Sequence, residues 1–142
     1  MKTVIVYYSY RGTTKKYSES LSKETGADIF EVQALKRKSI FGVALTECPK
    51  SLMQKPTKIQ SINLDLSGYQ KIILAFPLWA GFPAPAFNNI VNMLPSGKEI
   101  EIIIVSSGGE TKPENKEKVI ALVNKTGSTV INYKDILNTS IK

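Results

Sequence analysis

The residues best suited to chemistry form a short, hydroxyl-rich loop near the N-terminus. It follows the apolar run Val4–Tyr8 and consists of Ser9, Tyr10, Arg11, Gly12, Thr13 and Thr14. A helical pattern begins directly after it, so backbone N–H groups and the helix dipole both favour negative charge at this point. Hydroxyls add donors for phosphate oxygens, and Gly12 permits close approach of a ligand. The loop therefore suits a phosphate, although an ordinary capped strand-to-helix turn uses the same residue types.

Composition excludes several kinds of catalysis. The 142 residues contain no histidine, which is the commonest general base and metal ligand. The single Cys48 has no second cysteine for a disulfide or a zinc site, and we interpret it as a small apolar filler. We therefore name no catalytic residue and no metal ligand, and we expect a bound cofactor to supply any chemistry.

Length and composition are typical of one globular domain spanning residues 1–142. The apolar runs, such as Ile72–Trp79, are far shorter than the ~20 residues that a membrane span needs. The first residues do not have the pattern of a secretory signal, so a cytoplasmic location is expected.

The net charge of +7 indicates a basic surface. Part of this charge clusters at Lys36, Arg37 and Lys38, and more lies at Lys50, Lys55 and Lys58. Such a surface attracts nucleic acid or an acidic protein, but solvated surface charge is the simpler interpretation. No zinc knuckle or aromatic RNA-binding motif accompanies the lysines, so nucleic acid is not an expected partner.

Strands and helices alternate along the chain. Strands are predicted at Lys2–Tyr8, Ala27–Leu35, Gln70–Phe76, Glu99–Val105 and Ser128–Tyr133. Helices are predicted at Thr13–Thr25, Ala84–Leu94 and Pro113–Thr126, with a short terminal turn at Asp135–Ile141. Residues 36–68 are interpreted as one irregular helix followed by a meandering connection. The alternation predicts an α/β fold, a parallel sheet covered by helices on both faces.

Three loops follow the carboxyl ends of the first, third and fourth strands. They are Ser9–Thr14, Pro77–Phe82 within the Pro- and Gly-rich loop Pro77–Pro85, and Ser106–Glu110. The second loop holds the only tryptophan, Trp79. Because the carboxyl ends of parallel strands lie at one edge of a sheet, we expect the three loops to converge there.

These loops resemble those of the flavodoxin-like family of FMN-binding proteins. Tyr8–Thr14 is similar to the family's phosphate loop, Phe76–Gly81 to its Pro-(Ile/Leu)-Trp loop beside the flavin ring, and Ser106–Gly109 to its Ser-Gly-Gly stretch. The similarity covers about Lys2 to Tyr133. It implies a flavodoxin-like three-layer sandwich that binds FMN, with a five-stranded parallel sheet of order 2-1-3-4-5 and helices on both faces.

The resemblance also implies which residues hold FMN. Those of the phosphate loop are Ser9, Tyr10, Arg11, Gly12, Thr13 and Thr14, and those bordering the isoalloxazine ring are Pro77, Leu78, Trp79, Ala80, Gly81, Phe82, Ser106, Ser107, Gly108 and Gly109. Trp79 either stacks on the ring or fills the core, and its loop neighbours favour stacking. Arg11 departs from the family's usual Ser or Thr, and the third loop lacks the aromatic that many carriers stack on the outer ring face.

Three functions fit this sequence. The favoured one is an electron carrier between redox proteins. The second is an FMN-dependent NAD(P)H:quinone-type reductase, and the third is a binding module that kept the fold without a cofactor. The short chain favours a carrier, whereas the open outer ring face favours an enzyme with a small acceptor such as a quinone. Carriers of this family are usually acidic, so the charge of +7 predicts an acidic redox partner protein.

Overall fold

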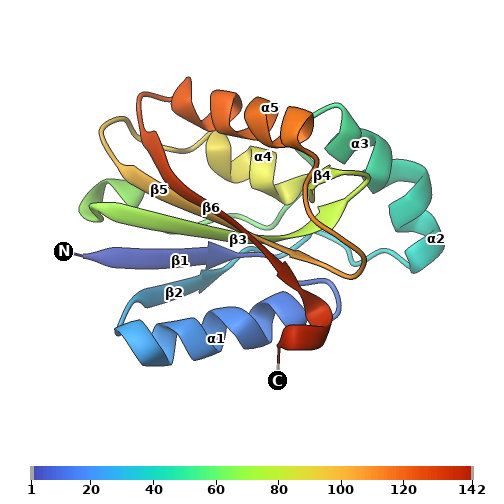
Figure 1. Cartoon of the computed structure of the whole chain (residues 1–142), viewed down its shortest axis with the longest axis horizontal. Coiled ribbons are helices and arrows are strands. Elements are labelled where there is room, and N and C mark those ends of the chain that lie inside the picture. The colour runs from blue at the N-terminus through green and yellow to red at the C-terminus, as the bar shows by residue number, and fades with distance from the viewer. Residues whose placement is uncertain (1, 142) are drawn as a thin grey trace.

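Figure 1 shows the computed structural model, which describes residues 2–141. Its central sheet has the strand order β2-β1-β3-β5-β6, and these five strands run parallel. In that order their bounds are Asp28–Glu31, Thr3–Tyr7, Lys71–Trp79, Glu99–Ser106 and Thr129–Leu137. The short β4 (Phe82–Pro83) pairs antiparallel with the end of β3. Apart from β4, this is the predicted order 2-1-3-4-5, which is confirmed.

Helices cover both faces of the sheet, as predicted (Figure 1). They are α1 (Thr13–Thr25) on one face, and α4 (Ala86–Val91) and α5 (Pro113–Asn124) on the other. Leu21 of α1 packs against one apolar cluster, while Phe87 of α4 and Val119 of α5 belong to the other. The central strands are continuously apolar because both of their faces are buried. Within residues 2–141, the structure holds no helix long and apolar enough to cross a bilayer.

The stretch Pro77–Pro85, predicted as a loop, is largely a hairpin. β3 continues through Trp79, and β4 returns against it with Phe82 opposite Trp79. Ala80 and Gly81 form the two-residue turn between them, with φ of +53° and +85°. A turn with two positive φ values matches the twist of paired strands, so the hairpin is a stable alternative to an open loop.

Residues 40–52 form a continuous helical stretch where the sequence predicted an irregular helix. It consists of α2 (Ile40–Gly42), the π-helical η1 (Val43–Glu47) and α3 (Cys48–Leu52). The N–H of Cys48 donates to Val43, five residues earlier. Since Pro49 has no N–H and its ring excludes an ordinary helical turn, the wider turn before it allows the helix to continue. The chain then meanders to β3 through one 3-10 turn, η2 (Leu66–Gly68).

Other element ends also differ from prediction. β2 ends at Glu31, where the strand was predicted to run to Leu35, because Ala34 pairs with Ile59 and not with β1. β6 runs to Leu137, where a terminal turn was predicted from Asp135, because β5 offers it hydrogen-bonding partners as far as Ser106. The terminal turn is the shorter η3 (Asn138–Ser140). The helix predicted at 84–94 is shorter in the structure, because α4 spans only Ala86–Val91. Its flanking residues form tighter hydrogen bonds of 3-10 type, such as Leu94 N–H to Val91 O.

Candidate functional site

The three predicted loops meet at one edge of the sheet, so their predicted convergence is confirmed. A cavity of about 260 Å³, which we call the loop cavity, opens between them. Its lining residues are Ser9, Tyr10, Arg11, Thr13, Thr14, Pro77, Leu78, Trp79, Val105, Ser106, Ser107 and Asn138. Of these, Val105 and Asn138 were not among the predicted site residues. All three loops therefore face one small space.

The N-terminal loop, residues 9–14, presents donors to the loop cavity. Gly12 has a φ of +96°, a conformation that favours glycine, and its N–H donates to Ser9 Oγ over 3.0 Å. Within residues 2–141, no side chain caps the first turn of α1, which starts at Thr13 and holds no acidic residue there. The first-turn amides, together with the dipole of a 13-residue helix, thus suit an anion.

Trp79 forms a wall of the loop cavity at the end of β3. Its indole packs edge-to-face against Tyr8 and Tyr10, with ring centroids 5.8 and 5.7 Å away. Tyr10 is held in turn, because its hydroxyl donates to the carbonyl of Lys38 and the Arg37 guanidinium lies 4.3 Å from its ring centroid. The indole is half-buried at the cavity, which rules out the alternative that it fills the core.

The hairpin turn is positioned by α5. Asn115 Nδ2 donates to the carbonyl of Gly81 over 3.1 Å. The positive φ at position 81 favours glycine, and a Cβ there would lie 2.9 Å from the same nitrogen and would displace the Asn115 side chain. The turn is therefore held by a hydrogen bond from α5.

Six predicted site residues do not line the loop cavity. They are Gly12, Ala80, Gly81, Phe82, Gly108 and Gly109. Phe82 is buried in the core, where its pairing with Trp79 places it. Gly109 closes the third loop instead, since its carbonyl accepts a hydrogen bond from the Ser106 hydroxyl. Contact with FMN stays a prediction for all sixteen residues.

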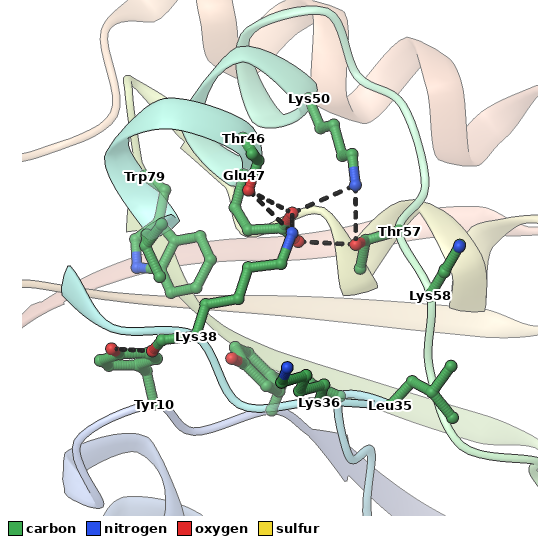
Figure 2. Close-up of a pocket in the computed structure, with 13 residues that line it drawn as sticks. Tyr10, Leu35, Lys36, Lys38, Thr46, Glu47, Lys50, Thr57, Lys58 and Trp79 are labelled. Atoms are coloured by element: carbon green, nitrogen blue, oxygen red, sulfur yellow. Dashed lines mark hydrogen bonds and ion pairs between the residues drawn. The ribbon is translucent and has the colours of Figure 1, made fainter. Parts of the chain in front are cut away.

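A larger cavity, of about 510 Å³, also borders Trp79 (Figure 2). Trp79 and Tyr10 line both spaces. The other lining residues are Tyr8, Ala34, Leu35, Lys36, Lys38, Val43, Thr46, Glu47, Lys50, Thr57 and Lys58. We call this the lysine cavity. No sequence pattern indicated it, because it is built largely from the segment 36–68, whose course the sequence left open.

Glu47 is the buried acid of the lysine cavity, with 6% of its surface exposed. Its carboxylate accepts hydrogen bonds from Lys38 Nζ at 2.7 Å, Lys50 Nζ at 3.1 Å and Thr57 Oγ1 at 2.6 Å. Burial by itself would raise the pKa of Glu47, but these hydrogen bonds and the charge of Lys50 lower it to about 2. Glu47 is therefore ionised at neutral pH and holds two lysines at the cavity wall.

Asparagines of α4 position the chain that supplies Thr57. Asn89 Oδ1 accepts from the Thr57 N–H at 2.9 Å, and Asn89 Nδ2 donates to the Thr57 carbonyl at 2.8 Å. Asn88 Nδ2 donates to the carbonyl of Lys55 at 3.0 Å. Two adjacent asparagines on an otherwise apolar helix are the sequence signal that could have indicated this anchor.

Known structures have the same architecture. The chain is similar to a flavoprotein from Lactobacillus acidophilus solved in complex with FMN, with a TM-score of 0.77 and 24% identity over 94% of this chain and 92% of that one. A putative flavoprotein from Bacteroides uniformis matches with a TM-score of 0.77 and 18% identity over 99% of this chain and 95% of that one. Oxidised flavodoxin 2 from Bacillus cereus matches with a TM-score of 0.58 and 15% identity over 96% of this chain and 84% of that one. No protein-family model and no curated protein sequence matches the chain. At these identities the likeness shows the flavodoxin-like fold, as the sequence predicted.

Proposed function

We propose that this protein binds FMN and acts in electron transfer. The loop cavity carries the proposal, because an uncapped helix N-terminus, a hydroxyl-rich loop and the only tryptophan meet around one space in the described chain. The flavodoxin-like fold supports it, as does the FMN complex of the Lactobacillus acidophilus flavoprotein.

The residues around the loop cavity fit the two ends of FMN. The hydroxyls of Thr13 and Thr14 and the first-turn amides of α1 would hold the phosphate, with Arg11 as a nearby cation. Trp79 would stack on the isoalloxazine ring, and Ser107 would border it from the third loop. When bound, FMN supplies electron transfer, while these residues bind it, orient it and exclude water.

The absorption spectrum of the purified protein tests this proposal, followed by titration of flavin-free protein with FMN. We expect yellow protein, or uptake of an equimolar amount of FMN with a change in flavin fluorescence. Colourless protein that takes up no FMN would contradict the proposal and favour a binding module without cofactor.

A reductase is the second candidate function. The ring face opposite Trp79 would be met by the third loop, whose residues 106–112 include no aromatic side chain. This open face gives a small acceptor such as a quinone room to approach. Steady-state reduction of a quinone by NADH or NADPH, catalysed by the FMN-loaded protein, would favour the reductase over the carrier.

As a carrier, the protein would have an acidic redox partner. The net charge is +7. Arg11 lines the loop cavity, four lysines line the lysine cavity, and Arg37 lies over the ring of Tyr10, which borders both. The helical stretch 40–52 adds exposed apolar side chains, including Phe41 at 73% exposure. An apolar patch with a charged rim is typical of a surface that contacts another protein.

A further inference from the structure

The proposed FMN site leaves the interior of the lysine cavity unused. Its volume of about 510 Å³ lies within the range of roughly 300–1,000 Å³ found for small-molecule sites. Figure 2 shows Trp79 and Tyr10 on one side of it, with Leu35 and Lys58 on the other. Of the residues that the structure describes, only Trp79 and Tyr10 line both this space and the loop cavity, so a ligand here would occupy a site next to that of the FMN phosphate and ring but built largely from other residues.

The charge of the cavity selects an anion. Four lysines and one glutamate are among its lining residues, a balance of three positive charges. Glu47 pairs with Lys38 and Lys50, but in the part of the chain described here neither Lys36 nor Lys58 forms an ion pair. Two cations thus face the cavity without a counter-charge from the protein.

The remaining walls select a flat, apolar body. Tyr8 and Trp79 present aromatic surfaces, and Leu35 and Val43 present aliphatic ones. Leu35 is 59% exposed, so ligand binding would remove apolar surface from water. Burial raises the pKa of Tyr8 to about 12, so its hydroxyl stays protonated and is available as a donor.

We propose that the lysine cavity binds a small organic anion of the aryl carboxylate class. Its carboxylate pairs with Lys36 and Lys58, and its ring lies against Tyr8 and the Trp79 indole. This site goes beyond the proposed function, since apart from the shared wall its residues lie outside the FMN loops and its occupation does not require FMN.

Calorimetry with 2-naphthoate tests the proposal, with the neutral 2-naphthylmethanol as the matched probe. Both are titrated into the full chain, with and without saturating FMN. We expect 2-naphthoate to bind in both states, about tenfold or more tighter than the alcohol, because only the anion pairs with the lysines. Trp79 is the only tryptophan, so its single indole N–H resonance in a nitrogen-15 spectrum must shift on binding.

Paired charge variants locate the site. Lys36→Gln/Lys58→Gln should weaken 2-naphthoate binding about tenfold and leave binding of the alcohol unchanged. Lys118→Gln/Lys125→Gln removes the same charge from exposed positions on α5 and directly after it, and should leave both affinities within about twofold. Circular dichroism of both variants checks that the fold is kept.

The proposal would be overturned by absence of 2-naphthoate binding at millimolar concentration, by equal affinity for anion and alcohol, by equal loss of affinity in both double variants, or by an unshifted indole resonance. Competitive displacement of 2-naphthoate by FMN would also overturn it, because the cavity would then belong to the flavin site. Failure of FMN to bind would contradict the proposed function and leave these results intact.

Discussion

Trp79 borders both cavities of this protein. Its edge-to-face contacts with Tyr8 and Tyr10 hold the indole in place. Tyr10 is itself held by its hydrogen bond to the Lys38 carbonyl and by the Arg37 guanidinium over its ring. A side chain that is held before binding loses little further freedom when a ring stacks on it. Trp79 is therefore the residue on which both proposed ligands depend.

Replacing Trp79 with alanine should weaken FMN binding. The loss expected for one stacked aromatic contact is roughly 1–3 kcal/mol, or about 5- to 150-fold in Kd. Trp79→Phe should keep a large part of the affinity, because it retains an aromatic face. Titration of flavin fluorescence measures all three proteins, and an unaltered Kd for Trp79→Ala would show that the indole does not stack.

Gly12→Ala should destabilise the fold by about 1 kcal/mol. No atom of the described chain lies within 4 Å of a Cβ built at position 12, so the cost comes from the φ of +96° and not from a clash. Gly68→Ala is the matched control, because its Cβ also meets open space but its φ is not positive. Urea unfolding compares the two, and equal effects would contradict the role of backbone strain.

At the scale of elements, the helical stretch 40–52 and the connection after it form one structural unit. α4 holds Thr57 through Asn89, and Thr57 and the two lysines hold Glu47 at the end of η1. Few apolar side chains of this stretch are buried, so polar contacts carry much of its attachment to the sheet. Its position is therefore sensitive to the charge of Glu47.

The stabilisation by Glu47 should depend on pH. Its pKa in the folded protein is about 2, below the ordinary 4.5, so folding favours the ionised form. This stabilisation, about 2–3 kcal/mol, is complete above the ordinary pKa and is lost as the pH falls from there towards 2. Glu47→Gln should therefore be less stable than the parent at pH 7, and the gap should narrow in acid.

Urea unfolding at about pH 7 and pH 3 measures that gap. Glu117→Gln, which alters an exposed acid on α5, serves as the control. Its free energy of unfolding should differ little from that of the parent at both pH values. A gap for Glu47→Gln that stays the same at both pH values would mean that its ionisation does not stabilise the fold.

The contact between α5 and the β3–β4 hairpin should also affect the flavin site. Asn115→Ala removes the hydrogen bond to Gly81, which is expected to cost about 1 kcal/mol. Amide exchange at residues 79–82 should quicken and FMN affinity should fall, because the Trp79 wall is held less firmly. Asn63→Ala, at an exposed position outside both cavities, should change neither measurement. Unchanged exchange in Asn115→Ala would show that the hairpin holds itself.

At the scale of the whole molecule, charge should control encounters with redox partners. Arg11 lines the loop cavity, and four lysines with one glutamate line the lysine cavity, so positive charge exceeds negative charge close to where electrons would leave the flavin. Opposite charges raise association rates at low salt, and the effect declines as the Debye length shortens.

The oxidation rate of the reduced, FMN-loaded protein by ferricyanide should fall several-fold between about 20 mM and 500 mM salt. The rate with the cationic tris(phenanthroline)cobalt(III) should rise over the same range, because salt screens a repulsion. Stopped-flow absorbance of the flavin measures both rates. The same salt response for the anionic and cationic oxidants would contradict an electrostatic role for this surface.

The sequence by itself determined the parallel sheet and the edge where the loops meet, and its resemblance to the flavodoxin-like family implied the strand order. Apolar runs such as Ile72–Phe76 and amphipathic segments such as Thr13–Thr25 carry local patterns that specify strands and helices. The handedness and spacing of parallel strands then leave few arrangements, so Ser9–Thr14 and Trp79 were expected at one edge.

Only the tertiary structure decided that a second cavity, the lysine cavity, forms next to the loop cavity. The lysine cavity depends on contacts between Lys38, Glu47, Thr57 and Asn89, which are far apart in sequence and follow no period. The π-helical turn before Pro49 and the pairing of Phe82 with Trp79 likewise depend on the surrounding packing. Local patterns record which face of an element is buried, whereas long-range polar contacts become visible only when the chain has brought their members together.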